Sequence, residues 1–68
     1  MKLTIEIEQE TDGRWIAEVM ELPGVIAYGT TLEEAKGRVQ ALALRVIADR
    51  IENAEAGAEL LNITFEAA

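Results

Sequence analysis

The sequence predicts an α+β domain in which one helix packs on one face of a four-stranded mixed sheet. Three observations lead to this fold class. Apolar and polar residues alternate near both ends of the chain, glycine-containing turn signals separate the first strands, and one long amphipathic segment precedes the last strand. The chain has 68 residues, which is the length of a single small domain, residues 1–68.

The first two predicted strands form a hairpin. Residues 2–9 alternate strictly between apolar and polar side chains, which is typical of a half-buried strand. The Asp12-Gly13 pair that follows is a strong hairpin signal, and the second strand then covers residues 14–19 or 14–20. The side chains on the two apolar faces are Leu3, Ile5, Ile7, Trp15, Ala17 and Val19.

A proline-glycine turn separates the second strand from the third. Pro23 fixes φ at the first central position of a turn and Gly24 supplies a positive φ at the next, which is the pattern of a type II turn. Residues 25–28 are apolar and partly β-branched, so they form a short third strand that Gly29 ends.

The predicted helix begins after Thr31 and runs from residue 32 to about residue 52. Thr31 and Glu34 form a capping box, in which the Thr31 hydroxyl accepts from the Glu34 N–H and the Glu34 carboxylate accepts from the Thr31 N–H. One stripe at helical spacing is apolar and faces the sheet. Its members are Leu32, Ala35, Val39, Leu42, Ala43 and Val46.

The last predicted strand covers residues 59–65, where alternation returns, and Gly57 lies in the connection before it. A helix of this length spans the sheet, so the last strand runs parallel to the first. The predicted strand order is therefore 3-2-1-4, with element order β-β-β-α-β and a right-handed crossover.

The composition excludes several kinds of active site. The chain has no Cys, no His and no Ser, so disulfides, thiolate or imidazole metal ligands and the usual nucleophile pairs are excluded. We therefore predict no catalytic residue, no metal ligand and no cofactor. One alternative stays open, a metal site formed by Glu6, Glu8 and Glu18, although glutamates that alternate with apolar residues are typical of a solvated strand face.

The charge predicts the class of partner. The net charge is −7 at pH 7, which repels nucleic acid and favours a basic partner protein. No apolar run approaches the roughly 20 residues of a membrane span, and the first ten residues do not form a signal peptide. We therefore expect a cytoplasmic protein with no direct nucleic-acid or membrane contact.

Three stretches of the chain are candidate protein-binding surfaces. We also expect self-association as a dimer or a higher even oligomer, because the core is small and half of the chain is hydrophobic. Ile47 fits a wide core stripe equally well, and the sequence does not assign the surfaces to partners. The turn supplies Glu21, Leu22, Pro23 and Gly24, the open sheet face supplies Ile16, Met20, Ile26 and Tyr28, and the helix flank supplies Leu44, Ile47 and Ile51.

Residues 12–35, DGRWIAEVMELPGVIAYGTTLEEA, resemble the signature of the HicB-like antitoxin family. In that signature a D-G-x-aromatic-x-A strand is followed by E-L-P-G, a short strand, a glycine turn and E-E-A at the start of a helix. The matching positions are Asp12, Gly13, Trp15, Ala17, Glu18, Glu21, Leu22, Pro23, Gly24, Gly29, Thr31, Glu33, Glu34 and Ala35. The resemblance implies a partial ribonuclease H-like fold without a working nuclease site.

The resemblance also implies a function within a toxin-antitoxin system. HicB-like antitoxins bind HicA, a small basic mRNA-cleaving toxin, and mask its catalytic His. Many members carry a DNA-binding domain after the last strand, and residues 1–68 have no counterpart to it. Two alternatives remain, an orphan homo-oligomeric binding module of unknown ligand and a residual metal-dependent nuclease.

Overall fold

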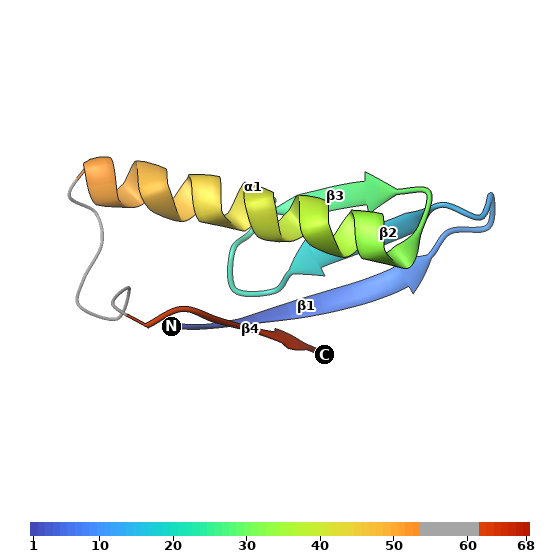
Figure 1. The fold of residues 1–68 in the computed structure, drawn as a ribbon, viewed down its shortest axis with the longest axis horizontal. Coiled ribbons are helices and arrows are strands. Elements are labelled where there is room, and N and C mark those ends of the chain that lie inside the picture. Colours follow the sequence, from blue (N-terminus) through green and yellow to red (C-terminus); the bar gives the residue numbers. More distant parts are fainter. Residues whose placement is uncertain (54–61) are drawn as a thin grey trace.

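The computed structural model describes residues 1–53 and 62–68, and its four strands form one mixed sheet in the order β3-β2-β1-β4 (Figure 1). Strand β1 pairs antiparallel with β2 and parallel with β4, while β2 pairs antiparallel with β3. The predicted fold class, strand order and helix bounds are confirmed. The elements are β1 (Lys2–Gln9), β2 (Trp15–Val19), β3 (Ile26–Gly29), α1 (Leu32–Glu52) and β4 (Thr64–Ala67).

Two glycines with positive φ make the turns of the three-stranded meander. In the hairpin, Gly13 has φ +93° and its N–H donates to the Glu10 carbonyl at 3.0 Å. In the second turn, Gly24 has φ +85° and the Val25 N–H donates to the Leu22 carbonyl at 3.0 Å. Both positions favour glycine because a Cβ is strained there. The predicted Pro-Gly turn is confirmed, with β3 starting one residue later than expected.

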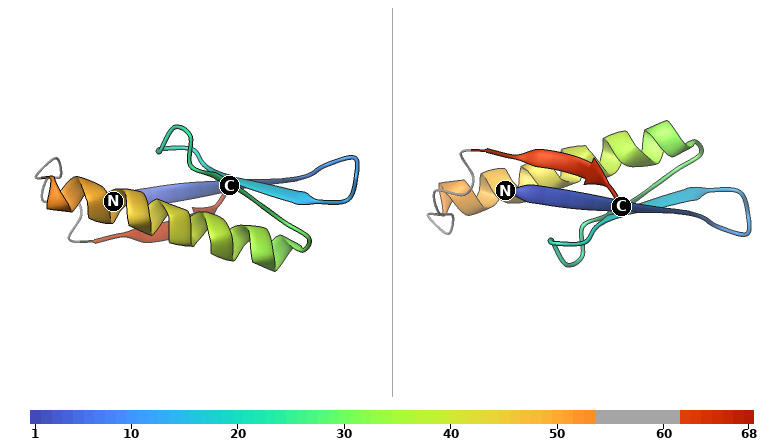
Figure 2. Two further views of the ribbon diagram at one scale, coloured as in Figure 1. Left: turned by 90° about the horizontal axis from the view of Figure 1, so that it is seen from above. Right: turned by 90° about the horizontal axis from the view of Figure 1, so that it is seen from below.

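The core lies between α1 and one face of the sheet, and Figures 1 and 2 show the helix lying across that face. Small residues on the helix allow it to approach the strands closely. A Cβ placed on Gly29 would lie 2.5 Å from the Ala35 backbone nitrogen, so only glycine fits where β3 meets the first helical turn. The buried side chains of the core are Leu3, Ile5, Ala17, Val19, Leu22, Val25, Ala35, Val39, Ala43 and Ile47.

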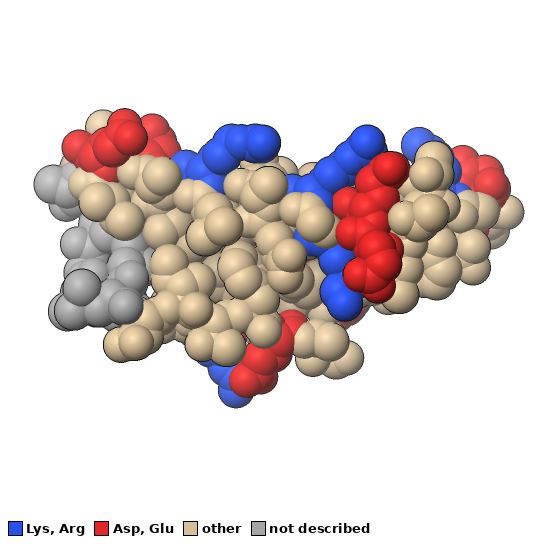
Figure 3. Space-filling view, viewed as in Figure 1, with Lys and Arg blue, Asp and Glu red and all other residues tan. Residues whose placement is uncertain are grey.

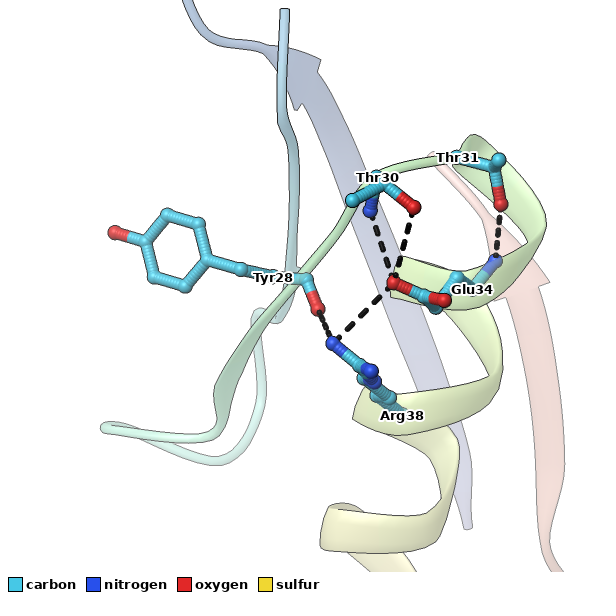
Figure 4. Close-up of polar contacts among 5 residues, drawn as sticks. All are labelled: Tyr28, Thr30, Thr31, Glu34 and Arg38. Carbon is cyan, nitrogen blue, oxygen red and sulfur yellow. Dashed lines mark hydrogen bonds and ion pairs between the residues drawn. The ribbon is translucent and has the colours of Figure 1, made fainter.

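The start of α1 is capped, with one partner different from the prediction (Figure 4). The Thr31 hydroxyl accepts from the Glu34 N–H at 3.1 Å, as expected. The Glu34 carboxylate, however, accepts from the N–H of Thr30 at 2.9 Å, one residue before the predicted donor. This Thr30 N–H, and then the charge of Arg38, lower the pKa of Glu34. Arg38 Nη1 lies 3.3 Å from that carboxylate and also donates to the Tyr28 carbonyl at 3.0 Å.

Strand β4 begins later than predicted, at Thr64 rather than at residue 59. Its pairing with β1 explains the difference, because the Lys2–Thr64 pair opens the parallel ladder and the Leu3–Phe65 pair continues it. The Phe65 side chain is half-buried beside the core. The predicted strand positions 59–61 and the connection at Gly57 lie outside the described residues.

Candidate functional site

The sheet face turned away from α1 carries an exposed apolar cluster, which we call the open-face patch. It consists of Ile16, Met20, Ile26 and Tyr28, as the alternation predicted. Met20, Tyr28 and Ile26 are 49%, 43% and 39% exposed, and Ile16 is half-buried. The patch extends over β2 and β3, because Ile16 on β2 lies directly opposite Tyr28 on β3. Exposed apolar side chains gathered in this way make the open-face patch a candidate contact surface.

A row of carboxylates borders the open-face patch, and we call Glu6, Glu8 and Glu18 the acidic row. Glu8 lies opposite Ile16, and Glu6 lies opposite Glu18 on the neighbouring strand. Like charges directly opposite each other disfavour sheet pairing, so this arrangement is not explained by the stability of the sheet. Within residues 1–53 and 62–68, no three His, Cys, Asp or Glu side chains are arranged to hold a metal ion. The acidic row is therefore a band of negative charge beside apolar surface.

Tyr28 lies at one end of the patch and has a cationic neighbour. The Arg14 guanidinium lies 5.1 Å from the centre of the Tyr28 ring, and Arg14 also forms an ion pair with Asp12 at 2.8 Å. The Tyr28 ring points away from α1, while its carbonyl faces Arg38 (Figure 4). Alternation within residues 14–20 puts Arg14 on the same face as Ile16. The contact with Tyr28, however, depends on the register of β2 against β3, which the sequence pattern does not give.

Glu21, predicted as a contact residue, is exposed but holds the turn in place. Its carboxylate accepts from the Thr4 N–H at 2.7 Å and from the Thr4 hydroxyl at 2.8 Å. These two hydrogen bonds, the backbone one first, lower the pKa of Glu21. The following Pro23 and Gly24 are exposed. The turn therefore offers a surface whose shape depends on the charged form of Glu21.

Two predicted contact residues do not lie on the surface. The prediction for Leu22 is wrong: it is 1% exposed, because hydrogen bonds on both sides of the turn, Leu22 N–H to the Val19 carbonyl and Val25 N–H to the Leu22 carbonyl, fold it into the core. For Ile47 the core alternative holds, with 2% exposure. Leu44 and Ile51 remain on the surface, with 47% and 55% exposure.

Comparison of the chain with known proteins finds no matching family model, curated protein or solved structure. Among the residues that the structure describes, no helix is long and apolar enough to cross a membrane. The features of the chain that bear on its function are the two exposed apolar surfaces, their charges and the motif in residues 12–35.

Proposed function

We propose that this chain is a non-catalytic antitoxin of the HicB-like type, which binds and inhibits a small basic mRNA-cleaving toxin through the open face of its sheet. The observation that carries the proposal is the acidic row beside the open-face patch. Apolar surface supplies contact area, and the adjoining carboxylates select a cationic partner. The sequence motif in residues 12–35 supplies the identity of that partner class.

The distribution of charge supports the open face as the toxin-binding side. Helix α1 carries four acidic and four basic residues, so the net charge of −7 belongs to the rest of the chain. The acidic row and Glu21 contribute to it on or beside the open face. An electric field concentrated on one side of a protein accelerates encounter with a partner of opposite charge and orients it. A basic toxin is thus steered to the sheet rather than to the helix.

The composition of the patch fits a binding surface with a small energetic centre. Tyr28 presents an exposed aromatic ring beside Arg14, and aromatic and arginine side chains dominate the binding energy of many interfaces. Ile16 on β2 lies opposite Tyr28 on β3. Ile26 is the next residue of β3 on the same face as Tyr28, two positions earlier in the chain. We expect these three residues to form the buried centre of the complex, with the acidic row at its rim.

The test uses the purified chain and a small basic toxin of the HicA type. Calorimetry measures binding, and cleavage of a defined mRNA measures inhibition. The Ile26→Glu, Tyr28→Ala double variant is expected to lose binding and inhibition at least tenfold, whereas Leu44→Glu on the helix retains both. Toxin binding unchanged by the open-face substitutions, or no binding by the wild type, would contradict the proposal.

A second candidate function is an orphan homo-oligomeric module, which the exposed apolar residues on α1 favour. Leu44 and Ile51 are exposed on α1, which lies on the other side of the sheet from the open face. A stable oligomer that neither binds nor inhibits a HicA-type toxin would support this alternative.

A further inference from the structure

Helix α1 has a second apolar row on the side that does not contact the sheet. Ala41, Leu44, Ala48 and Ile51 follow each other at intervals of three, four and three residues, and we call this row the outer seam. These intervals are those of the a and d positions in a coiled coil, where one helix packs against another. The pattern therefore indicates a helix partner.

The outer seam is unpartnered within the described part of the chain. The buried residues of α1 that face the sheet are Ala35, Val39, Ala43 and Ile47, a separate row whose last member, Ile47, lies next to Leu44 and Ile51 of the outer seam. Leu44 and Ile51 are about half exposed, and Ala48 is exposed as well. In Figure 3, much of the helix side of the molecule is uncharged surface, with charged groups along its upper and lower edges and in one band over the start of α1. Folding of the chain thus buries one apolar row of α1 against the sheet and leaves the outer seam exposed.

We propose that a second copy of this chain covers the outer seam, with the two α1 helices packed antiparallel about a two-fold axis. In antiparallel coiled coils a positions face d positions of the partner. Ala41 then faces the partner's Ile51, and Leu44 faces the partner's Ala48. Each layer combines a small side chain with a large one, and the two-fold axis repeats both layers. The row is complementary to itself, which a two-fold dimer requires.

The charge of α1 permits the same arrangement. Arg45 and Glu52 border the seam, and neither forms an ion pair with any described residue. Because α1 has as many basic as acidic residues, two chains of net charge −7 meet on the side that carries no net charge.

The edge of the sheet is a poorer contact for a second copy. Strand β3 is an edge strand, and unpaired backbone groups on such a strand can extend the sheet into another chain. Arg38 occupies this edge, because it donates to the Tyr28 carbonyl at 3.0 Å and is held by Glu34. The open face is strongly acidic and repels itself. The helix surface is therefore the contact that both shape and charge favour.

This dimer leaves both open faces uncovered, on the outer sides of the two sheets. Two toxin molecules then bind one dimer without competing with self-association. The inference does not depend on the proposed function, because the mass of the chain alone tests it.

The first experiment compares masses by sedimentation equilibrium. We expect the wild-type chain to have twice its 7.4 kDa monomer mass. The Leu44→Glu, Ile51→Glu variant is expected to halve that mass with an unchanged helical circular dichroism signal. Ile26→Glu, Tyr28→Glu is the matched control, because it adds the same charge to exposed residues on the open face. A monomeric wild type, or a dimer lost only in the control, overturns the proposal.

A second experiment tests the orientation and uses the absence of native Cys. Chains with Ala41→Cys and chains with Ile51→Cys are mixed and oxidised. We expect a disulfide between the two kinds of chain and little between identical ones. Strong crosslinking of Ala41→Cys chains to each other indicates a parallel pair and overturns the antiparallel arrangement.

Discussion

The open face of the sheet and the outer side of α1 are both exposed and apolar, yet they differ in charge. The open-face patch lies beside three glutamates, whereas the outer seam lies on a helix without net charge. Apolar area alone does not distinguish the two surfaces, because each exposes large hydrophobic side chains to a similar extent. The charge around each surface does, and on this basis we propose a basic partner for the sheet and a second copy for the helix.

The difference in charge between the two surfaces follows from the side-chain periods of a strand and of a helix. In a strand every second residue shares a face, so glutamates that alternate with core residues collect on the open side. In a helix a polar residue lies beside an apolar row rather than within it, and α1 carries as many basic as acidic residues. One chain can therefore carry two apolar surfaces that select different partners.

The largest expected effect separates the two sides of α1. Ile47→Ala removes a buried side chain and is expected to lower the free energy of unfolding by about 2–5 kcal/mol. Leu44→Ala is the control, with little effect at a protein concentration where sedimentation gives the monomer. Urea unfolding measures both. Equal losses for the two variants in the monomer would show that Leu44 also belongs to the core.

Two glycines, Gly29 and Gly37, also test which side of α1 is packed and which is exposed. Gly29→Ala places a Cβ 2.5 Å from the Ala35 nitrogen and is expected to destabilise the fold by about 1–3 kcal/mol. At Gly37 nothing lies within 4 Å of the new Cβ, so Gly37→Ala is expected to stabilise by up to about 1 kcal/mol. Thermal unfolding of both variants is the measurement. Destabilisation by Gly37→Ala would place another group against this side of the helix.

The acidic row is tested by association rates. Glu6→Gln with Glu18→Gln is expected to slow binding of the basic toxin by roughly tenfold at low salt and by less at high salt, because long-range attraction is screened. The same variant is expected to keep the dimer mass, since the row lies away from the outer seam. Stopped-flow fluorescence at two salt concentrations gives the rates. A rate independent of both substitution and salt would separate the acidic row from binding.

The smallest effect concerns pH and the turn beside the open face. Hydrogen bonds from Thr4 hold the pKa of Glu21 below its ordinary value of 4.5. The carboxylate therefore contributes stability above about pH 4.5, and this contribution is lost as the pH falls through the lowered pKa. Glu21→Gln is expected to weaken the pH dependence of unfolding between pH 5 and 3, and Thr4→Val to weaken it less, because the Thr4 N–H remains. Identical profiles for Glu21→Gln and wild type would exclude this contribution.

Much of the fold could be predicted from hydrophobic periodicity and from the turn and capping residues. Alternation, the Pro-Gly turn and the cap at Thr31 predicted the strand order and the bounds of α1. The side of each exposed strand residue also followed, since period two assigns a face without knowledge of the neighbours. The pattern failed at Leu22, because a leucine beside a Pro-Gly turn points inward or outward according to how the turn hydrogen-bonds.

Other parts of the candidate site depend on contacts between elements. The stripe that buries Ile47 follows every fourth residue along α1, and its extent depends on how far the sheet reaches beneath the helix. The contact of Arg14 with Tyr28 depends on register, and so does the juxtaposition of Glu6 and Glu18. Residue types predicted which side chains are exposed, whereas the structure was needed to show which of them lie together.

We propose that self-association and toxin binding use separate surfaces of the chain. Native mass spectrometry of the chain mixed with a HicA-type toxin tests it most directly. We predict a complex of two chains and two toxins for the wild type, and of one chain and one toxin for Leu44→Glu, Ile51→Glu. Loss of toxin binding in that variant, or a dimer that persists in it, would contradict the account.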